Sequence, residues 1–189
     1  AGAGIYVADV LGNAFSPALI RLFSAHDEAV VDYIGFRRDL ESIAATRAAL
    51  QGSDTDLKVI DTIFHKMQAA HSKRNPADEA ELDAEFHLAI IEASHNVILL
   101  HMMRSMFDLL REGVFFNRQI MFKQRTTRDL LLDHHAAINR AIQARDPEAS
   151  KAAVVVHLDY VEGCLDSQRK AERHEEVAQL RYAHEQDRP

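Results

Sequence analysis

Three of the four prolines in this chain directly follow residues that cap helices. The pairs are Ser16-Pro17, Asn75-Pro76 and Asp146-Pro147. A Ser, Asn or Asp side chain accepts a hydrogen bond from the free amides at the start of a helix, and proline suits the first helical position because no helical partner awaits its nitrogen there. Each pair therefore predicts that a helix begins, not that one is broken.

Further signals divide most of the remaining chain into helices. Ser53-Asp54-Thr55-Asp56 and Thr126-Thr127-Arg128-Asp129 resemble capping boxes, Asn96 is a predicted cap, and Gln51-Gly52 ends a helix. We predict an all-α fold, a bundle of about six or seven helices, with a metal site in its core. The expected helices span about 16–24, 27–50, 53–71, 75–94, 96 to at least 110, 126–145 and 146 to beyond 164, followed by a polar tail, 168–189.

The first ten residues follow a different pattern. Ala1–Ala8 contains two glycines and then β-forming residues, which predicts the end of a hairpin with one short strand. A single strand needs a partner, so the rest of the sheet is expected upstream of this chain. We therefore divide the chain into a strand remnant, residues 1–10, and an all-helical domain, residues 11–189.

Charge and composition exclude several kinds of partner. The net charge of −7 disfavours direct contact with the phosphates of nucleic acids. Cys164 is the sole cysteine, so an intrachain disulfide is impossible and a cytoplasmic protein is expected. No apolar run approaches the roughly 20 residues of a membrane span, and the first residues do not resemble a signal peptide.

The residues with the clearest chemical potential are one aspartate and three histidines. Asp83 and His87 are four residues apart, so both lie on one face of the predicted helix. His157 shares a face with Tyr160, Val161 and Cys164 in the last helix. His135 lies in an apolar pattern of its own, but so does His134, and periodicity alone does not choose between them.

Each of these residues also has a structural explanation. A lone histidine is most simply a core imidazole, and a lone aspartate is most simply paired on the surface. Together they favour a metal site, because a buried carboxylate costs several kcal/mol unless a cation compensates it. One carboxylate and three imidazoles suit zinc, nickel, iron or manganese, with zinc expected in a purified sample.

An ordered set of motifs runs through these residues. The segments are Arg37-Arg38-Asp39-Leu40-Glu41, Asp83-Ala84-Glu85-Phe86-His87 with Ala93-Ser94-His95-Asn96, His135-Ala136-Ala137-Ile138 with Ala141-Ile142 and Asp146, and His157-Leu158. In this order they resemble the C-terminal effector-binding (FCD) domain of the FadR subfamily of GntR-type transcriptional regulators.

The resemblance implies an antiparallel bundle that holds a divalent cation through Asp83, His87, His135 and His157, which favours His135 over His134. It also implies a small organic carboxylate as effector, with Arg37 and Asn96 as effector-binding residues. Arg38 is a rival for the role of Arg37, and a surface salt bridge is the alternative explanation of either arginine.

The resemblance further identifies residues 1–10 as the remnant of a wing strand, so that a winged helix-turn-helix domain outside this chain would bind operator DNA, as a homodimer. The chain is then a sensor and not an enzyme. The alternative, a metal-dependent hydrolase or other metalloenzyme, is disfavoured because no His-Glu-x-x-His motif occurs and Glu85 lies on a different helical face from Asp83 and His87. A helical module without a ligand is a further alternative.

Overall fold

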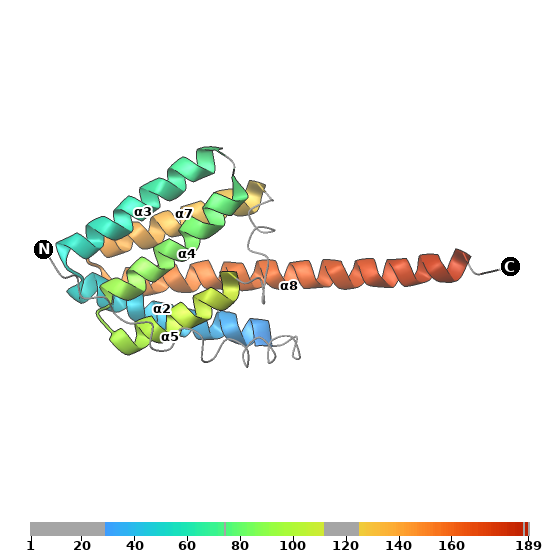
Figure 1. The fold of residues 1–189 in the computed structure, drawn as a ribbon, viewed down its shortest axis with the longest axis horizontal. Coiled ribbons are helices and arrows are strands. Elements are labelled where there is room, and N and C mark those ends of the chain that lie inside the picture. The colour runs from blue at the N-terminus through green and yellow to red at the C-terminus, as the bar shows by residue number, and fades with distance from the viewer. Residues whose placement is uncertain (1–28, 74, 112–124, 187, 189) are drawn as a thin grey trace, which may run out of the picture.

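The structure is a computed structural model that describes residues 29–73, 75–111, 125–186 and 188. Six helices make up this part of the chain (Figure 1). They are α2 (Ala29–Gln51), α3 (Asp54–Lys73), α4 (Pro76–Ala93), α5 (Val97–Arg111), α7 (Arg125–Gln143) and α8 (Pro147–Gln186). The all-α prediction is confirmed, whereas the wing strand and the helix predicted at 16–24 lie outside the described residues.

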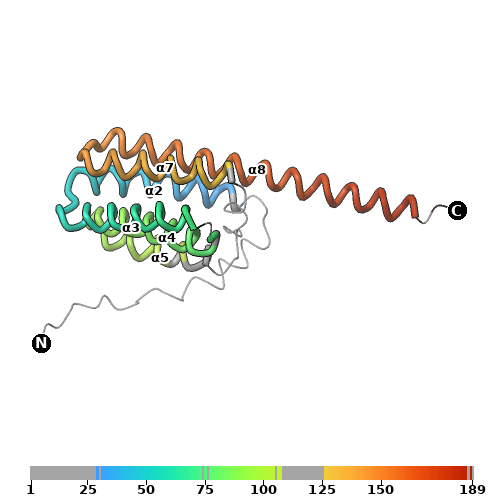
Figure 2. Tube along the Cα trace, turned by 90° about the horizontal axis from the view of Figure 1, so that it is seen from above, coloured from blue at the N-terminus to red at the C-terminus, as the bar shows by residue number. Residues whose placement is uncertain are grey.

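The helices form two layers, with α2, α7 and α8 in one and α3, α4 and α5 in the other (Figure 2). Two or three residues separate consecutive helices at 52–53, 74–75, 94–96 and 144–146, so the chain reverses direction at each of these points. Helix α2 packs on α4 across the layers and on α8 within its own, and α7 packs on both α3 and α8. The inner faces of α2, α4, α7 and α8 therefore meet near the centre of the bundle.

Local capping chemistry explains where the helices begin. Asn75 Oδ1 accepts a hydrogen bond from Ala77 N at 3.1 Å, and Asn96 Oδ1 accepts one from Leu99 N at 3.1 Å. Ser53 and Asp56 form a reciprocal capping box: Asp56 N donates to Ser53 Oγ and Ser53 N donates to Asp56 Oδ2. The predicted starts of α3, α4 and α5 are thereby confirmed.

Tight turns follow helices α2 and α4. A Cβ atom added to Gly52 would lie 2.5 Å from Ala48 O, so only glycine fits without displacing the backbone of α2. His95, which follows α4, has a φ of 50°, in the left-handed region that commonly terminates helices. The predicted ends of α2, α3, α4 and α7 lie within two residues of the observed ends, which is the usual uncertainty of a helix boundary.

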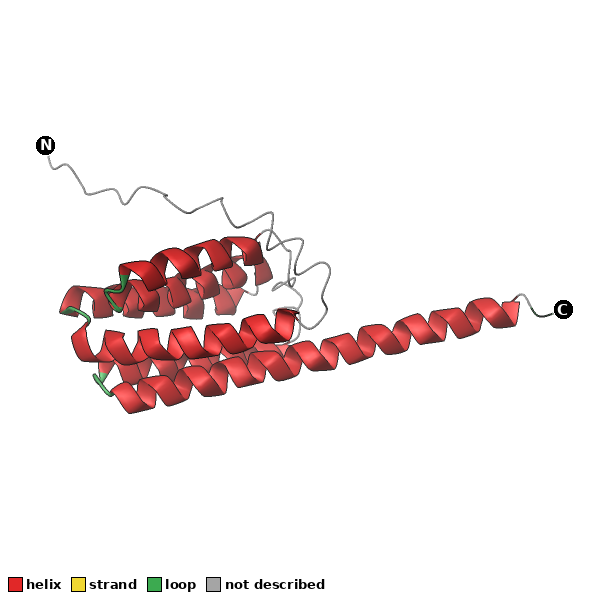
Figure 3. Ribbon diagram, turned by 90° about the horizontal axis from the view of Figure 1, so that it is seen from below, coloured by secondary structure: helices red, strands yellow, loops and turns green. Residues whose placement is uncertain are grey.

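Helix α8 is far longer than the bundle and projects out of it (Figure 3). Its last buried side chain is Leu165, and residues 170–186 are exposed. Side-chain contacts within this segment join residues one turn apart, as between Gln179 and Glu175. The polar tail predicted from the sequence thus continues as a solvated helix. None of the described helices is long and apolar enough to cross a lipid bilayer.

Candidate metal centre

Helix α4 supplies two of the four predicted ligands. Asp83 and His87 lie one turn apart on its inner face, beside Phe86 and Ile90, which are also buried. The cap at Asn75 sets where this helix starts, and the apolar residues along it set which face turns inward. The local pattern of apolar residues therefore carries a carboxylate and an imidazole into the core.

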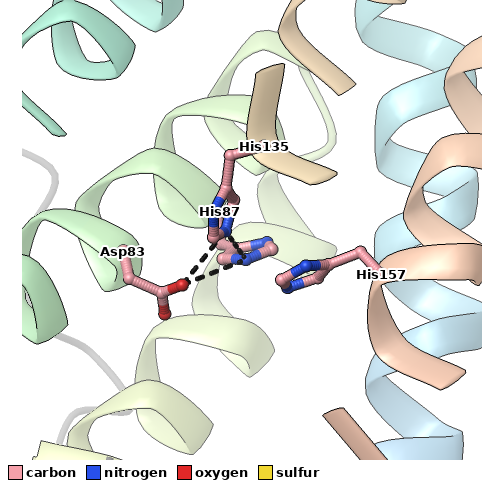
Figure 4. Close-up of side chains that lie close together, drawn as sticks. All are labelled: Asp83, His87, His135 and His157. Atoms are coloured by element: carbon pink, nitrogen blue, oxygen red, sulfur yellow. Dashed lines mark hydrogen bonds and ion pairs between the residues drawn. The ribbon is translucent and has the colours of Figure 1, made fainter. Parts of the chain in front are cut away.

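Helices α7 and α8 supply the other two ligands. His135 shares the buried face of α7 with Leu131 and Ile138, and His157 shares the buried face of α8 with Val154 and Val161. The exposed fractions of the four residues range from 1% for His87 and His135 to 5% for Asp83. Figure 4 shows the three imidazoles and the carboxylate converging on one point.

The ligand atoms of this group all lie within 4.8 Å of one another. His135 Nε2 is 3.0 Å from Asp83 Oδ1 and 3.2 Å from His87 Nε2. The His135 and His157 rings approach to 4.5 Å between centroids. His134, the alternative left by periodicity, is only half-buried. Its ring lies 5.1 Å from that of Tyr160 and 6.0 Å from that of His157, and it does not belong to the group of converging ligand atoms.

The chemistry of this group fits a divalent transition metal. Neutral imidazoles are the form that binds metals, and burial, together with the neighbouring His135 and His87, lowers the pKa of His157 well below its usual value. Among the described residues, the Nδ1 atom of His157 is buried without a hydrogen-bond partner. Three nitrogen donors and one oxygen donor suit zinc, nickel, iron or manganese alike.

Arg37 and Arg38 occupy very different environments. Arg38 lies at the surface of α2 and pairs with Asp159 at 2.6 Å and Glu162 at 3.0 Å, both on α8. Arg37 is 3% exposed, and its guanidinium lies 5.1 Å from the centroid of the Phe107 ring. Its Nη2 atom is buried without a hydrogen-bond partner among the described residues.

The sequence predicted no role for Glu41, which is buried between Arg37 and His87. Its Oε1 accepts a hydrogen bond from Arg37 Nε at 2.6 Å, and its Oε2 lies 2.6 Å from His87 Nδ1. Burial alone would raise the pKa of Glu41, but the charges of Arg37 and His87, together with the close contacts to both side chains, lower it to about 2. Burial likewise opposes the charge of Arg37, yet Glu41 raises the arginine's pKa, so this pair stays ionised.

Asn96 lies at the start of α5, where its amide oxygen caps the helix. Its predicted contact with an effector stays a prediction. The environment of the four ligands is aromatic: Phe86 contacts the His135 ring edge-on at 5.3 Å, and Phe107 stacks on His87 at 6.5 Å. Such surroundings have a low effective dielectric, which strengthens interactions between charges.

Comparisons with known proteins agree with this architecture. The family model described as the FCD domain matches residues 32–160. The Glc operon transcriptional activator of Escherichia coli strain K12 is 32% identical over 143 residues, which are 74% of this chain and 56% of the relative. The HTH-type transcriptional regulator LutR of Bacillus subtilis strain 168 is 30% identical over 165 residues, 87% of this chain and 74% of that protein.

A solved structure, that of E. coli McbR/YncC, has a TM-score of 0.62 at 20% identity and covers 74% of this chain and 65% of its own length, which indicates a shared fold. The chain spans about half the length of two curated E. coli operon regulators that it matches, 49% and 56%.

Proposed function

Because this chain belongs to the FCD-domain family of GntR-type transcriptional regulators, we propose that it is the sensor of a FadR-subfamily regulator, in which a core metal anchors a small organic carboxylate. Occupancy of this site would control DNA binding by a winged-helix domain outside this chain. The observation that carries the proposal is the convergence of four buried ligand atoms from three helices, within 4.8 Å of one another.

Asp83, His87, His135 and His157 would hold the metal, with zinc expected first. A divalent cation with four protein ligands keeps further coordination positions that accept a carboxylate oxygen. Arg37 supplies the second half of the pocket, since its Nη2 atom is buried without a partner among the described residues and can donate a charge-assisted hydrogen bond to a carboxylate.

The names of relatives support the class of effector. One is named for an L-lactate dehydrogenase operon and another for a galactonate operon, and both L-lactate and galactonate are hydroxy carboxylates. These relatives are regulators and not enzymes, so the metalloenzyme alternative gains no support. A homodimer and a palindromic operator belong to the same proposal.

The proposed coupling from the pocket to the surface would run through α2. Arg37 faces the metal ligands, while the next residue, Arg38, bridges α2 to Asp159 and Glu162 on α8. A shift of α2 on effector binding would therefore act on the helix that leaves the bundle. Such coupling requires that the effector bind the two states of the protein with different affinities.

The test is a metal analysis followed by calorimetry with L-lactate on the zinc-loaded chain. We expect close to one transition metal per chain and saturable binding of the carboxylate. Arg37→Lys keeps the charge but loses the planar fork, so affinity should fall by about 1.5–3 kcal/mol, or about 10–100-fold, at unchanged metal content. Arg38→Lys is the matched control and should bind as the wild type does. A wild-type chain that takes up no metal would refute the proposal.

A further inference from the structure

One side chain on α2 connects the two halves of the proposed pocket. Glu41 is 2% exposed, and its two carboxylate oxygens face different partners. Oε1 accepts from Nε of Arg37, the arginine expected to bind the effector, whereas Oε2 lies beside Nδ1 of His87, a metal ligand. A single carboxylate thus contacts both groups at 2.6 Å.

The contact with His87 decides which ring nitrogen is available to a metal. A neutral imidazole carries one proton, and a carboxylate beside Nδ1 holds the proton there. Nε2 then keeps its lone pair, and Nε2 is the atom 3.2 Å from His135 Nε2 and 3.9 Å from Asp83 Oδ1. Glu41 therefore orients His87 with its basic nitrogen toward the other ligands.

The contact with Arg37 decides which part of the guanidinium is available to an anion. Nε is engaged with Glu41, and the face of the group lies over Phe107. The terminal Nη2, buried and without a partner among the described residues, remains for a ligand. Arginine is thereby fixed in one rotamer before the effector arrives, which reduces the entropy lost on binding.

Charge adds a third effect. Asp83 and Glu41 are negative, Arg37 is positive and metal-bound histidines are neutral, so the group has one net negative charge alone and one net positive charge with a divalent cation. One further negative charge neutralises it. A monocarboxylate supplies one, whereas a dicarboxylate supplies one too many for a buried site.

Resting on the proposed function, we propose that Glu41 is a positioning and specificity-determining residue: it orients His87 toward the metal and Arg37 toward the effector, and its charge favours monocarboxylates over dicarboxylates. Glutamine cannot replace it, because an amide has a single oxygen acceptor for two donors and its NH₂ group would face one of them.

The test compares Glu41→Gln, Glu41→Asp and the wild type, with Glu79→Gln as the matched control. Glu79 is also buried and paired with an arginine, Arg128, but in the first turn of α4. Zinc affinity is measured by competition with a chelator. Calorimetry on zinc-saturated protein then gives the affinities for L-lactate and for L-malate, which has a second carboxylate.

Glu41→Gln should bind zinc about 10–100-fold more weakly, the usual effect of losing a group that orients a ligand histidine. It should also raise the ratio of malate to lactate affinity about tenfold, because the repulsion between Glu41 and the second carboxylate of malate is removed. Glu41→Asp keeps the charge but shortens the reach, so zinc affinity should fall while the ratio stays as in the wild type. Glu79→Gln should change neither value by more than about threefold.

The Glu41→Asp variant keeps the proposal testable if Glu41→Gln does not fold. Wild-type affinity for zinc and an unchanged malate-to-lactate ratio in Glu41→Gln would overturn the role of Glu41 alone. A shifted ratio in Glu41→Asp would overturn the charge effect. If the wild-type chain binds neither zinc nor L-lactate, the proposed function itself is refuted, so the two failures are distinct.

Discussion

Replacing Asp83 with asparagine tests whether Asp83 is a metal ligand or only a structural acid. Asparagine has the same shape and can still accept a hydrogen bond from His135 Nε2, which lies 3.0 Å from Asp83 Oδ1. It lacks only the charge. In the metal-free chain a carboxylate that is 5% exposed is costly to bury, so removing the charge is tolerated, whereas in the metal-bound chain the same change removes a charged ligand.

The expected magnitude follows from the burial of the site. Deleting one member of a buried charge pair costs about 3–5 kcal/mol, which corresponds to about 10²–10⁴-fold in zinc affinity. Zinc at about 100 times its Kd stabilises the wild type by about 2.7 kcal/mol. The same zinc concentration is at or below the Kd of the variant and adds at most about 0.4 kcal/mol. For a domain of this size, 1 kcal/mol moves Tm by about 2–4 °C.

The assay is thermal unfolding of chelator-treated protein with and without added zinc. We expect zinc to raise the Tm of the wild type by about 5–11 °C and that of Asp83→Asn by less than about 2 °C. Asp133→Asn, at an exposed position of α7, is the matched control and should respond as the wild type does. A variant that loses stability without zinc, yet keeps the wild-type zinc shift, would show that Asp83 is structural and refute the reasoning.

Two further predictions concern stability. Arg128→Met leaves Glu79, which is 5% exposed, without its main cation, so the free energy of unfolding in urea should fall by about 3–5 kcal/mol. Zinc affinity should not change. The control Lys170→Met, which breaks an exposed pair on α8, should change the free energy of unfolding by less than about 0.5 kcal/mol. Asp56→Ala removes half of the capping box of α3 and should cost about 1 kcal/mol at pH 7. Because hydrogen bonds from Ser53 hold the folded-state pKa of Asp56 below its usual value, this contribution is present above the ordinary pKa, about 3.9, and is lost as the pH falls through the folded-state pKa. If the urea midpoints of the wild type and Asp56→Ala differ by as much at pH 2 as at pH 7, this explanation is contradicted.

The sequence predicted the helices well because their start signals are local. A capping side chain contacts amides two or three residues away, as Asn75 and Asn96 do, so the chemistry is visible in a short window. The lengths of unsupported segments are harder to predict. Helix α8 continues to Gln186 although residues 170–186 are exposed, since contacts one turn apart within the helix maintain it without a core.

Local sequence patterns predicted only some of the candidate metal ligands. Asp83 and His87 share one helix, and their spacing alone places both on one face. His135 and His157 come from other helices, so only an ordered resemblance could choose His135 over its neighbour His134. The choice between Arg37 and Arg38 depends on a rotation of about 100° around α2, which the sequence does not specify within so few residues.

Glu41 is the residue of the candidate site that the sequence analysis did not predict. Arg37 and Glu41 are four residues apart, a spacing that on most helices is an exposed pair worth about 0.3–0.5 kcal/mol. Both residues are buried here, and a buried ion pair is weak evidence of added stability, so its role has to be sought in what else it contacts. Here the third partner is His87, which meets Glu41 only because α2 packs on α4 in one register. That register is a property of the packed bundle and of no single segment. The i, i+4 spacing of Arg37 and Glu41 in the sequence therefore says little about function. The packed structure says more, because there the same pair is buried and contacts a histidine of another helix.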